Sequence, residues 1–392
     1  MKNPETRIQE RKSKAATLVL KCSKLKAGKY KKEDHFFGKL YHIGENELRR
    51  IPYGKFEFYD KDGKPFKMKW NLFPQRVQNI VLLNNTAWVN FKPLNWEFKS
   101  LIAKITPKIV NEKRKSLACQ YEVEEVWRCK KHDEVLSLKR FLNGKAILLV
   151  RKKLVYSNAP AAFELTVMRL NHSTKPKHLA KNGIEIRTSK ERYGPGSMWD
   201  IIDVVVTGKN GHIVILRISR SPKKWLLMLV LSSNGAKILT RSLCEVSISD
   251  FSYDTSEVRA SPNSRFVYLG GCRGLLFVYE ILHERRLVLR TKYDLKEKIM
   301  KRYHIPTISM LSLNHIFCYN EKHLILLMRF KDSPRCLKLL VFSFDEERGR
   351  IVRTAAKNAN EFKFEGDIKF YRKNGEVFFY DLKQSVYNLT LF

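Results

Sequence analysis

The sequence has few acidic residues for its number of basic ones. Asp and Glu together number 39 against 75 Lys and Arg, which gives a formal net charge of +36. A positive field of this strength is expected to attract an acidic partner, whether RNA, DNA, an anionic membrane surface or an acidic protein. The alternative is a lysine-rich composition that reflects nucleotide bias in a genome, with the extra lysines on solvated strand edges.

Long apolar runs are also missing. The longest, such as WLLMLVL at 225–231, are much shorter than the roughly 20 residues of a membrane-spanning helix, so no membrane span is expected. Near the start, the run AATLVL stops at Lys21, which is too short for the core of a secretion signal. The seven cysteines are scattered and form no CxxC pair. We therefore expect reduced thiols and a cytoplasmic or nuclear location.

Motifs for catalysis and metal binding are absent or incomplete. The sequence has no GxSxG stretch and no Walker loop, and GPGS at 194–197 lacks the following lysine of a phosphate-binding loop. Cys119, Cys129 and His132 form the one tempting group of metal ligands, but a structural zinc site needs four. We predict a protein that is not an enzyme and that holds no cofactor and no metal.

Turn dipeptides are the clearest positive signal. Asn-Gly and Asp-Gly tolerate the positive φ that both central residues of a tight type I′ hairpin require. Most of the six examples have β-branched or aromatic residues on either side, which is typical of antiparallel strands. We expect turns at residues 62–63, 143–144, 182–183, 210–211, 234–235 and 374–375.

Several segments repeat the order of an apolar strand, a turn and a second apolar strand. Residues 203–218 (DVVVTGKNGHIVILRI) and 267–281 (VYLGGCRGLLFVYEI) share this order, a third copy covers 367–382, and a looser one covers 323–345. Both strands of each pair are apolar over most of their length. They are therefore expected to be covered on both faces.

One stretch carries a family resemblance. SPNSRFVYLGGCRGLLFVYEI at 261–281 resembles the second and third strands of a WD-repeat blade: a Ser-Pro turn precedes one strand, a Gly-rich turn leads to the next, and an aromatic-acidic pair, Tyr279-Glu280, closes it. Tyr380-Asp381 closes the last copy in the same way. The likeness to WD40-type β-propellers covers about 200–392. It implies an all-β chain whose residues 36–392 form an irregular WD40-like β-propeller.

The chain departs from that family pattern in its blade spacing and its dipeptides. No Gly-His marks a blade start, no Trp-Asp closes a strand, and the first two copies lie 63 positions apart, where a regular blade takes about 40–45 residues. The blades must then be irregular, or one contains an inserted hairpin such as residues 225–243. A β-sandwich pair or another all-β stack is the structural alternative.

The first residues differ from the rest. Residues 1–35 are rich in Lys and Arg and poor in aromatics, so we predict a basic N-terminal arm that is helical or disordered. Within the arm, TLVLKC at 17–22 resembles the start of the elongin-binding box of SOCS-type proteins, but Lys26 stands where that box needs an apolar residue.

The resemblance implies an interaction scaffold or adaptor that works without catalysis and docks acidic protein partners. A ubiquitin-ligase substrate receptor is one form of it, because YDLK at 380–383 resembles the Trp-Asp-x-Arg motif of propellers that dock on cullin-4 adaptors. An RNA- or chromatin-associated propeller that binds phosphates is the alternative. Arg273 lies at the predicted turn tip, where its charge could be solvated instead of contacting a partner. The basic residues expected to contact a partner are Lys24, Lys26, Lys29, Lys31, Lys32, Lys113, Arg114, Lys115, Arg151, Lys152, Lys153 and Arg273.

Overall fold

The structure is a computed structural model of the 392-residue chain. The residues that it describes are 20–24, 40–43, 46–50, 56–59, 65–66, 75–83, 86–93, 100–108, 120–128, 133–153, 162–169, 177–185, 200–220, 223–235, 237–246, 258–270, 275–295, 297, 311–320, 323–330, 333–345, 350–358, 369–373, 376–380 and 386–391.

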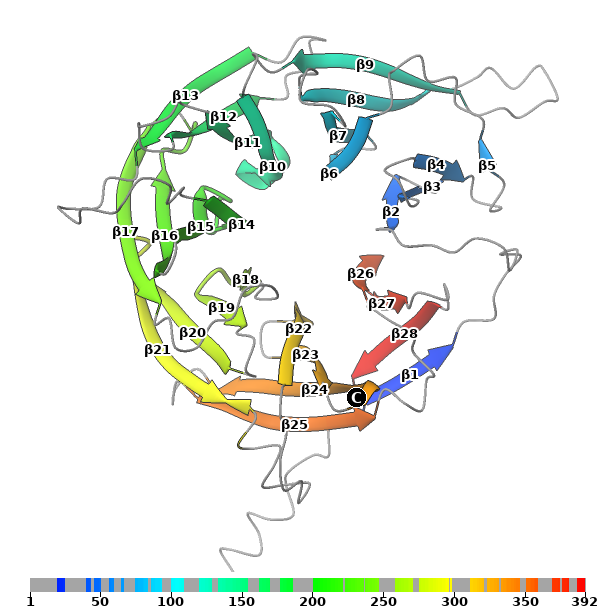
Figure 1. Cartoon of the computed structure of the whole chain (residues 1–392), viewed down its shortest axis with the longest axis vertical. Coiled ribbons are helices and arrows are strands. Elements are labelled where there is room, and N and C mark those ends of the chain that lie inside the picture. The colour runs from blue at the N-terminus through cyan, green and yellow to red at the C-terminus, as the bar shows by residue number, and fades with distance from the viewer. Residues whose placement is uncertain are drawn as a thin grey trace, which may run out of the picture.

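The described strands form seven four-stranded antiparallel sheets, arranged in a ring around a central axis (Figure 1). In each sheet one edge strand lies near the centre of the ring and the other at its outside, so the fold is a β-propeller. We number the sheets as blades 1 to 7 in chain order.

The strands of the first three blades follow one another along the chain. Blade 1 contains β2 (Leu40–Ile43), β3 (Asn46–Arg50), β4 (Phe56–Tyr59) and β5 (Pro65–Phe66); blade 2 contains β6 (Gln75–Leu83), β7 (Thr86–Pro93), β8 (Leu101–Lys108) and β9 (Gln120–Arg128); blade 3 contains β10 (Asp133–Phe141), the 3-10 turn η2 (Leu142–Gly144), β11 (Ala146–Lys153), β12 (Ala162–Arg169) and β13 (Lys177–Glu185).

The remaining blades keep this order until the last. Blade 4 contains β14 (Asp200–Thr207), β15 (Ile213–Arg220), β16 (Lys223–Leu231) and β17 (Ile238–Val246); blade 5 contains β18 (Val258–Ala260), β19 (Phe266–Gly270), β20 (Leu275–Leu282) and β21 (Arg286–Asp294); blade 6 contains β22 (Leu311–Cys318), β23 (His323–Phe330), β24 (Ser333–Asp345) and β25 (Arg350–Asn358); blade 7 contains β26 (Lys369–Lys373), β27 (Glu376–Tyr380), β28 (Val386–Leu391) and β1 (Leu20–Lys24).

Blade 7 joins the two ends of the described chain. β1 lies antiparallel to β28, with Leu20 opposite Leu391 and Lys24 opposite Tyr387. Of the predicted N-terminal arm, the structure describes residues 20–24, and they form a strand instead of a helix or a disordered segment. The reason is that β1 supplies hydrogen-bonding partners to the edge of β28, which would otherwise be an unpaired sheet edge.

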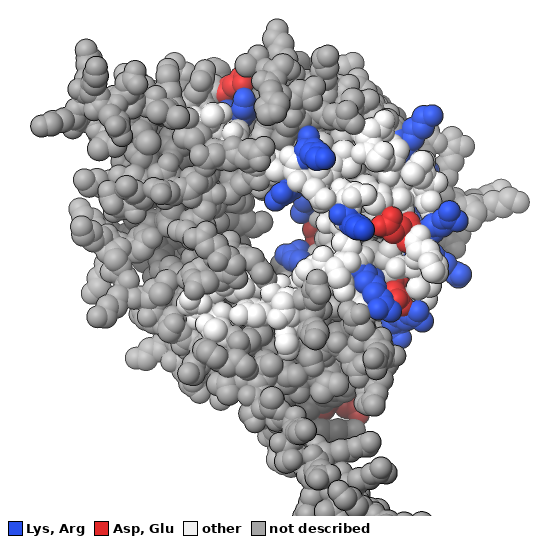
Figure 2. Space-filling model, turned by 180° about the vertical axis from the view of Figure 1, so that it is seen from behind, with Lys and Arg blue, Asp and Glu red and all other residues white. Residues whose placement is uncertain are grey.

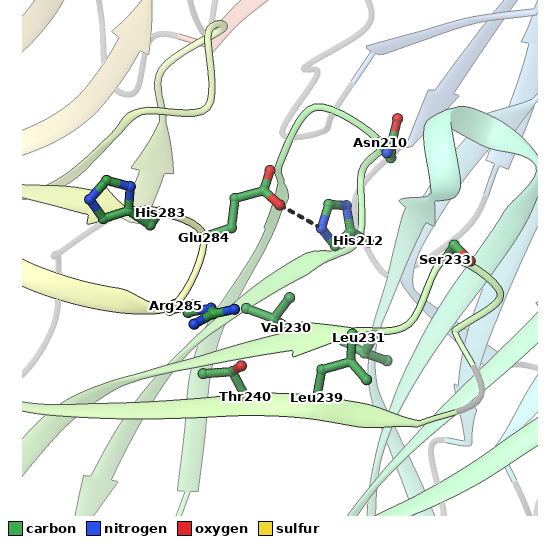
Figure 3. Close-up of a pocket in the computed structure, with 10 residues that line it drawn as sticks. All are labelled: Asn210, His212, Val230, Leu231, Ser233, Leu239, Thr240, His283, Glu284 and Arg285. Carbon is green, nitrogen blue, oxygen red and sulfur yellow. Dashed lines mark hydrogen bonds and ion pairs between the residues drawn. The ribbon is translucent and has the colours of Figure 1, made fainter.

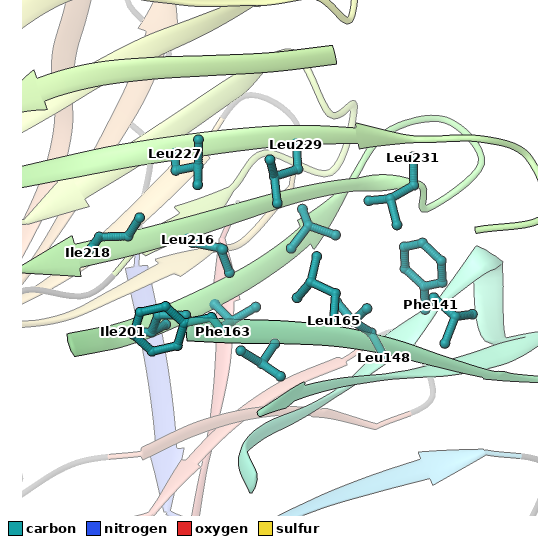
Figure 4. Close-up of a cluster of buried hydrophobic side chains, with 14 of the residues drawn as sticks. Phe141, Leu148, Phe163, Leu165, Ile201, Leu216, Ile218, Leu227, Leu229 and Leu231 are labelled. Carbon is teal, nitrogen blue, oxygen red and sulfur yellow. The ribbon is translucent and has the colours of Figure 1, made fainter. Parts of the chain in front are cut away.

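The blades pack face to face, as the apolar strands predicted. In β15, Val214, Leu216 and Ile218 belong to a buried cluster shared with blade 3 (Figure 4), whereas Ile213 and Ile215 belong to a cluster shared with blade 5. Alternate residues of one strand therefore enter two different cores. A third cluster joins blades 2 and 3 in the same way.

The spacing of the sequence copies has a simple explanation. Residues 203–218 contain the first and second strands of blade 4, whereas residues 267–281 contain the second and third strands of blade 5. The two copies are thus offset by one strand. Residues 225–243 are no insertion, because they contribute the regular third and fourth strands of blade 4.

Three of the six predicted tight turns are confirmed in the described residues. Residues 143–144, 210–211 and 234–235 connect neighbouring strands, whereas residues 182–183 lie inside β13, so that prediction was wrong. There the ladder with β12 continues through both residues, and its hydrogen bonds override the local turn preference. The pairs at 62–63 and 374–375 lie outside the described residues.

Gly211 holds the turns of blades 3 and 4 in contact. Its φ is +64°, and its carbonyl accepts a hydrogen bond of 3.0 Å from the backbone N–H of Leu142 in blade 3. A Cβ at this position would lie 2.9 Å from the backbone nitrogen of Asn143. Only glycine avoids both the backbone strain and the clash.

We expect Gly211→Ala to lower the free energy of unfolding by about 2 kcal/mol or more, since left-handed backbone alone costs an L residue about 1–2 kcal/mol. Urea unfolding followed by circular dichroism measures the change. Asn210→Ala, an exposed substitution in the same turn, is the control and should shift stability by no more than about 0.5 kcal/mol. Equal midpoints for the two variants would contradict the contact.

Glu280 sits where the aromatic-acidic pair was expected, near the end of the third strand of blade 5. Its side chain is 7% exposed and accepts a 2.9 Å hydrogen bond from Arg265 Nε and another from Arg290 Nε. Burial raises the pKa of Glu280, but the hydrogen bonds and charges of the two guanidiniums together lower the net pKa below the ordinary value. The carboxylate therefore stabilises the fold when it is ionised.

We expect Glu280→Gln to lower the free energy of unfolding by about 1–2 kcal/mol at pH 7, less than for a fully buried pair because both arginines are nearly half-exposed. The folded pKa lies below the unfolded one, so this stabilisation is complete above the unfolded pKa and is lost as pH falls through the folded value. Thermal melts from pH 7 to pH 3 should show the gap closing. A constant gap would contradict the ionic origin, and Glu245→Gln, exposed on β17, is the control.

Candidate binding site at the rim of blades 4 and 5

A pocket opens at one end of the seam between blades 4 and 5 (Figure 3). It is bordered by the β14–β15 and β16–β17 turns of blade 4 and by the β20–β21 turn of blade 5. The first and third connections of an antiparallel sheet lie at the same end, which brings these turns to one rim. The volume is about 630 Å³, within the range of about 300–1,000 Å³ for small-molecule sites. We call it the rim pocket.

The β20–β21 turn is strained. The Arg285 N–H donates a 2.9 Å hydrogen bond to the Leu282 carbonyl, and the two residues between them, His283 and Glu284, have φ of 47° and 53°. This is a type I′ turn, which Asn and Gly form at the least cost. Left-handed backbone costs other residues about 1–2 kcal/mol each. Strain of this kind tends to persist where the side chains have a function.

Glu284 reaches across the seam to blade 4. Its Oε2 lies 3.1 Å from His212 Nε2 (Figure 3), and the His212 side chain is 11% exposed. Because a carboxylate only accepts, we assign the ring proton to Nε2. His212 Nδ1 is buried and has no hydrogen-bond partner among the described residues. The His212 carbonyl accepts a 3.0 Å hydrogen bond from the Leu231 N–H, which fixes the backbone beside the ring.

The rim pocket contains several polar side chains without a partner among the described residues. Within the described part of the chain, several of its polar side chains make no hydrogen bond or ion pair, including the Arg285 guanidinium with its five N–H donors. One wall is apolar and consists of Val230, Leu231 and Leu239. Such an arrangement can bind an acceptor-rich group on an apolar stem. The polar side chains without a described partner are Asn210, Ser233, Thr240, His283 and Arg285.

Exposed leucines lie on the outermost strands of blades 4 and 5. The pairing of β17 with β16 skips Leu239, and that of β21 with β20 skips Arg290, beside Leu289. Leu239, Leu243 and Leu289 are 63%, 50% and 45% exposed, and they are the exposed large hydrophobic residues of the described chain. In β21 the bulge leaves both Leu289 and Arg290 exposed, whereas Leu239 and Leu243 belong to the regular alternation of β17. Leu239 also lines the rim pocket, so the surface and the pocket are continuous.

Basic side chains outnumber acidic ones among the exposed residues of the same strands and turns. Figure 2, which views the ring from behind, shows Lys and Arg gathered along the described blades with Asp and Glu between them. We name the exposed side chains of β17, β21 and the two turns at their ends the β17–β21 face. On β17, Arg241 and Leu243 lie opposite residues of the core shared with blade 3, whereas Leu289 on β21 lies opposite Tyr279 of the core shared by blades 4 and 5. Its acidic members are Glu245, Glu284 and Asp294, and its basic members are Lys237, Arg241, Arg285, Arg286, Arg290 and Lys292.

Four of the predicted contact residues lie in described strands: Lys24 in β1, and Arg151, Lys152 and Lys153 in β11. Arg151 lies inside blade 3, 5% exposed and paired with the buried Glu164 opposite it on β12, which removes it from the expected basic surface. Lys152 is partly exposed on β11. Lys24 lies in β1 and Lys153 in β11, and the structure describes the backbone of these two residues but not their side chains. The predicted residues outside the described ranges are Lys26, Lys29, Lys31, Lys32, Lys113, Arg114, Lys115 and Arg273.

The candidate metal ligands Cys119, Cys129 and His132 also lie outside the described residues. Among the residues that are described, no three His, Cys, Asp or Glu side chains gather as a metal site would require. No helix within these ranges has the length and apolarity to cross a membrane.

Sequence reasoning missed the rim pocket because its turn lacks a glycine. The stretch HER at 283–285 carries no turn dipeptide, and its only signal is three ionisable residues between two apolar strands. A second repeat was also overlooked. The first strands of blades 2, 3, 4 and 6 each contain an apolar residue, a bulge and a polar residue: Val77 and Asn79, Val135 and Ser137, Ile201 and Asp203, and Leu313 and His315.

No protein-family model matches the chain, and no curated protein matches it. Among solved structures, the periplasmic gluconolactonase of Pseudomonas aeruginosa matches at a TM-score of 0.51 and 11% identity, over 90% of this chain and 94% of that one. The Cps50 (Swd1) β-propeller domain of Myceliophteria thermophila matches at 0.51 and 11%, over 94% and 97%. At this identity the likeness concerns the fold, and it agrees with the ring of blades: the chain is an all-β β-propeller.

Proposed function

We propose that this β-propeller is a divergent WD40-like interaction platform that docks an acidic, amphipathic segment of a partner protein on the β17–β21 face. The observation that carries the proposal is the mixture on that face of three exposed leucines with a majority of basic side chains. The net charge of +36 also attracts an acidic partner from a distance, before any contact forms. Catalysis is no part of the proposal.

The leucines favour a protein partner over a nucleic acid. Single-stranded nucleic acids bind through aromatic side chains on which bases stack, and phosphates need only positive charge. The large hydrophobic side chains that are exposed in the described chain are leucines and include no aromatic residue. Leucines instead bury their surface against apolar side chains, which contributes about 1.5–3 kcal/mol for each one fully covered.

The two kinds of side chain have different effects on binding. Basic residues at the rim of an interface mainly accelerate the encounter with an acidic partner, and their effect weakens as salt rises. Buried apolar contacts mainly slow dissociation and depend little on salt. A partner held by both should bind quickly and survive a high-salt wash.

The ubiquitin-ligase form of the platform is a narrower proposal. It rests on the tetrapeptide at 380–383, of which the structure describes Tyr380 at the end of β27. The nucleic-acid alternative rests on the total charge. The nucleic-acid alternative makes a different prediction for the leucines of the β17–β21 face, so one experiment separates it from the main proposal.

The test compares the tagged protein with Leu243→Ser and Arg241→Glu variants in affinity purification from its own cells, with nuclease treatment and washes at low and high salt. We expect a stoichiometric partner that survives nuclease and is lost at least tenfold from both variants, because Leu243→Ser removes about 1.5 kcal/mol of burial. Lys209→Glu, the same kind of charge reversal on a turn off the face, should retain the partner.

Two outcomes would contradict the proposal. A partner kept at wild-type level by both variants binds elsewhere on the propeller. In the second outcome, the recovered material disappears with nuclease and Leu243→Ser behaves like the wild type. The positive charge would then serve phosphate binding instead.

A further inference from the structure

We infer that the rim pocket binds the side-chain carboxylate of a glutamate in the docked segment, with the Arg285 guanidinium as its principal contact. The inference deepens the proposed function and rests on it. Leu239 and Thr240 of β17 line the pocket, and Arg285 belongs to both the pocket and the β17–β21 face. A segment that lies along the face therefore passes the pocket mouth, where one of its side chains can enter.

The chemistry of the lining defines the ligand. Arg285 has no hydrogen-bond or ion-pair partner among the described residues, and a guanidinium binds a carboxylate through two parallel N–H···O bonds. The hydroxyl of Thr240, which lies on the same side of the pocket as Arg285 in Figure 3, can donate to the same group. Val230 and Leu239 offer an apolar wall beside these donors. The combination fits a carboxylate at the end of a short aliphatic stem.

The Glu284 carboxylate is the natural competitor for Arg285, because the two residues are adjacent in the chain. The structure directs it elsewhere: Glu284 extends towards His212 in blade 4, whereas Arg285 points to the side of Val230 (Figure 3). The hydrogen bond of 3.1 Å to His212 holds the acidic side chain in that direction. His212 and Glu284 are thus positioning residues that keep the Arg285 charge available.

The strained turn is consistent with this role. Consecutive side chains of a tight turn diverge, and the left-handed backbone at His283 and Glu284 sets the direction in which Glu284 leaves the hairpin. An Asn-Gly turn would form without strain but would provide no side chain to reach His212. The hydrogen bond between Glu284 and His212 across the seam offsets the backbone strain of the turn.

The first test measures binding of blocked glutamate, N-acetyl-glutamate methylamide, and of its glutamine counterpart by ligand-observed NMR titration. We expect the glutamate compound to bind the wild-type protein at least tenfold more tightly than the glutamine compound, and Arg285→Gln to remove that preference. Lys209→Gln, which removes a positive charge from the same rim outside the pocket, should retain it. Equal binding of the two compounds to wild-type protein, or an unchanged preference in Arg285→Gln, would overturn the inference.

The second test addresses the positioning pair through rescue. His212→Phe keeps the ring volume but releases Glu284, which can then neutralise Arg285, so we expect the affinity for blocked glutamate to fall at least fivefold. Adding Glu284→Gln in the same protein should restore it, because an amide cannot neutralise a guanidinium. A purely structural role for His212 would leave the double variant as weak as the single one, and that result would remove the positioning pair from the proposal.

The two proposals fail in different ways. If the β17–β21 face docks nothing, the Leu243→Ser protein and the wild type recover the same partners, while the preference for blocked glutamate persists. If the pocket binds no carboxylate, partner recovery still depends on Leu243, while Arg285→Gln changes neither assay.

Discussion

Burial of each blade between its two neighbours is the constraint on which the rest of the structure depends. A four-stranded sheet that is apolar on both faces cannot exist alone in water, and the described cores join blade 2 to blade 3, blade 3 to blade 4 and blade 4 to blade 5. The alternation within β15 makes this explicit, since its odd and even residues belong to different cores. Several polar groups inside these seams find partners there, as Asn90 does with the Val135 carbonyl at 2.9 Å and Asp203 with the Val258 N–H at 3.1 Å.

The same constraint determines where binding chemistry can occur. Side chains within the seams are committed to packing, and the buried pair of Arg151 and Glu164 shows that even a charged residue is used structurally there. Freedom exists at the ends of the seams, where turns meet, and on the outermost strands. Bulges at Leu239 and Arg290 occur on those strands. The rim pocket and the β17–β21 face are therefore contiguous for a physical reason.

The sequence predicted the architecture better than the site. Apolar strand pairs and Gly-containing turns such as that at Gly211 follow local rules, so the all-β propeller and several hairpins could be expected. The turn predicted at 182–183 failed because pairing with β12 extends through it. The turn at His283 and Glu284 could not be predicted, since its backbone contradicts local preference and is held by contact with His212, 72 positions away along the chain.

The choice of basic residues shows the same limit of sequence reasoning. Clusters of Lys and Arg predict an interaction surface, yet charge density alone does not distinguish a contact from a solvated or buried position, as Arg151 demonstrates. What distinguishes the β17–β21 face is the presence of features that cost free energy without a partner: exposed leucines, a strained turn and a guanidinium that its own neighbour does not neutralise. Each has a local alternative that would be more stable in isolation. Their coincidence at one rim is a stronger reason to expect binding there than the net charge of the whole chain.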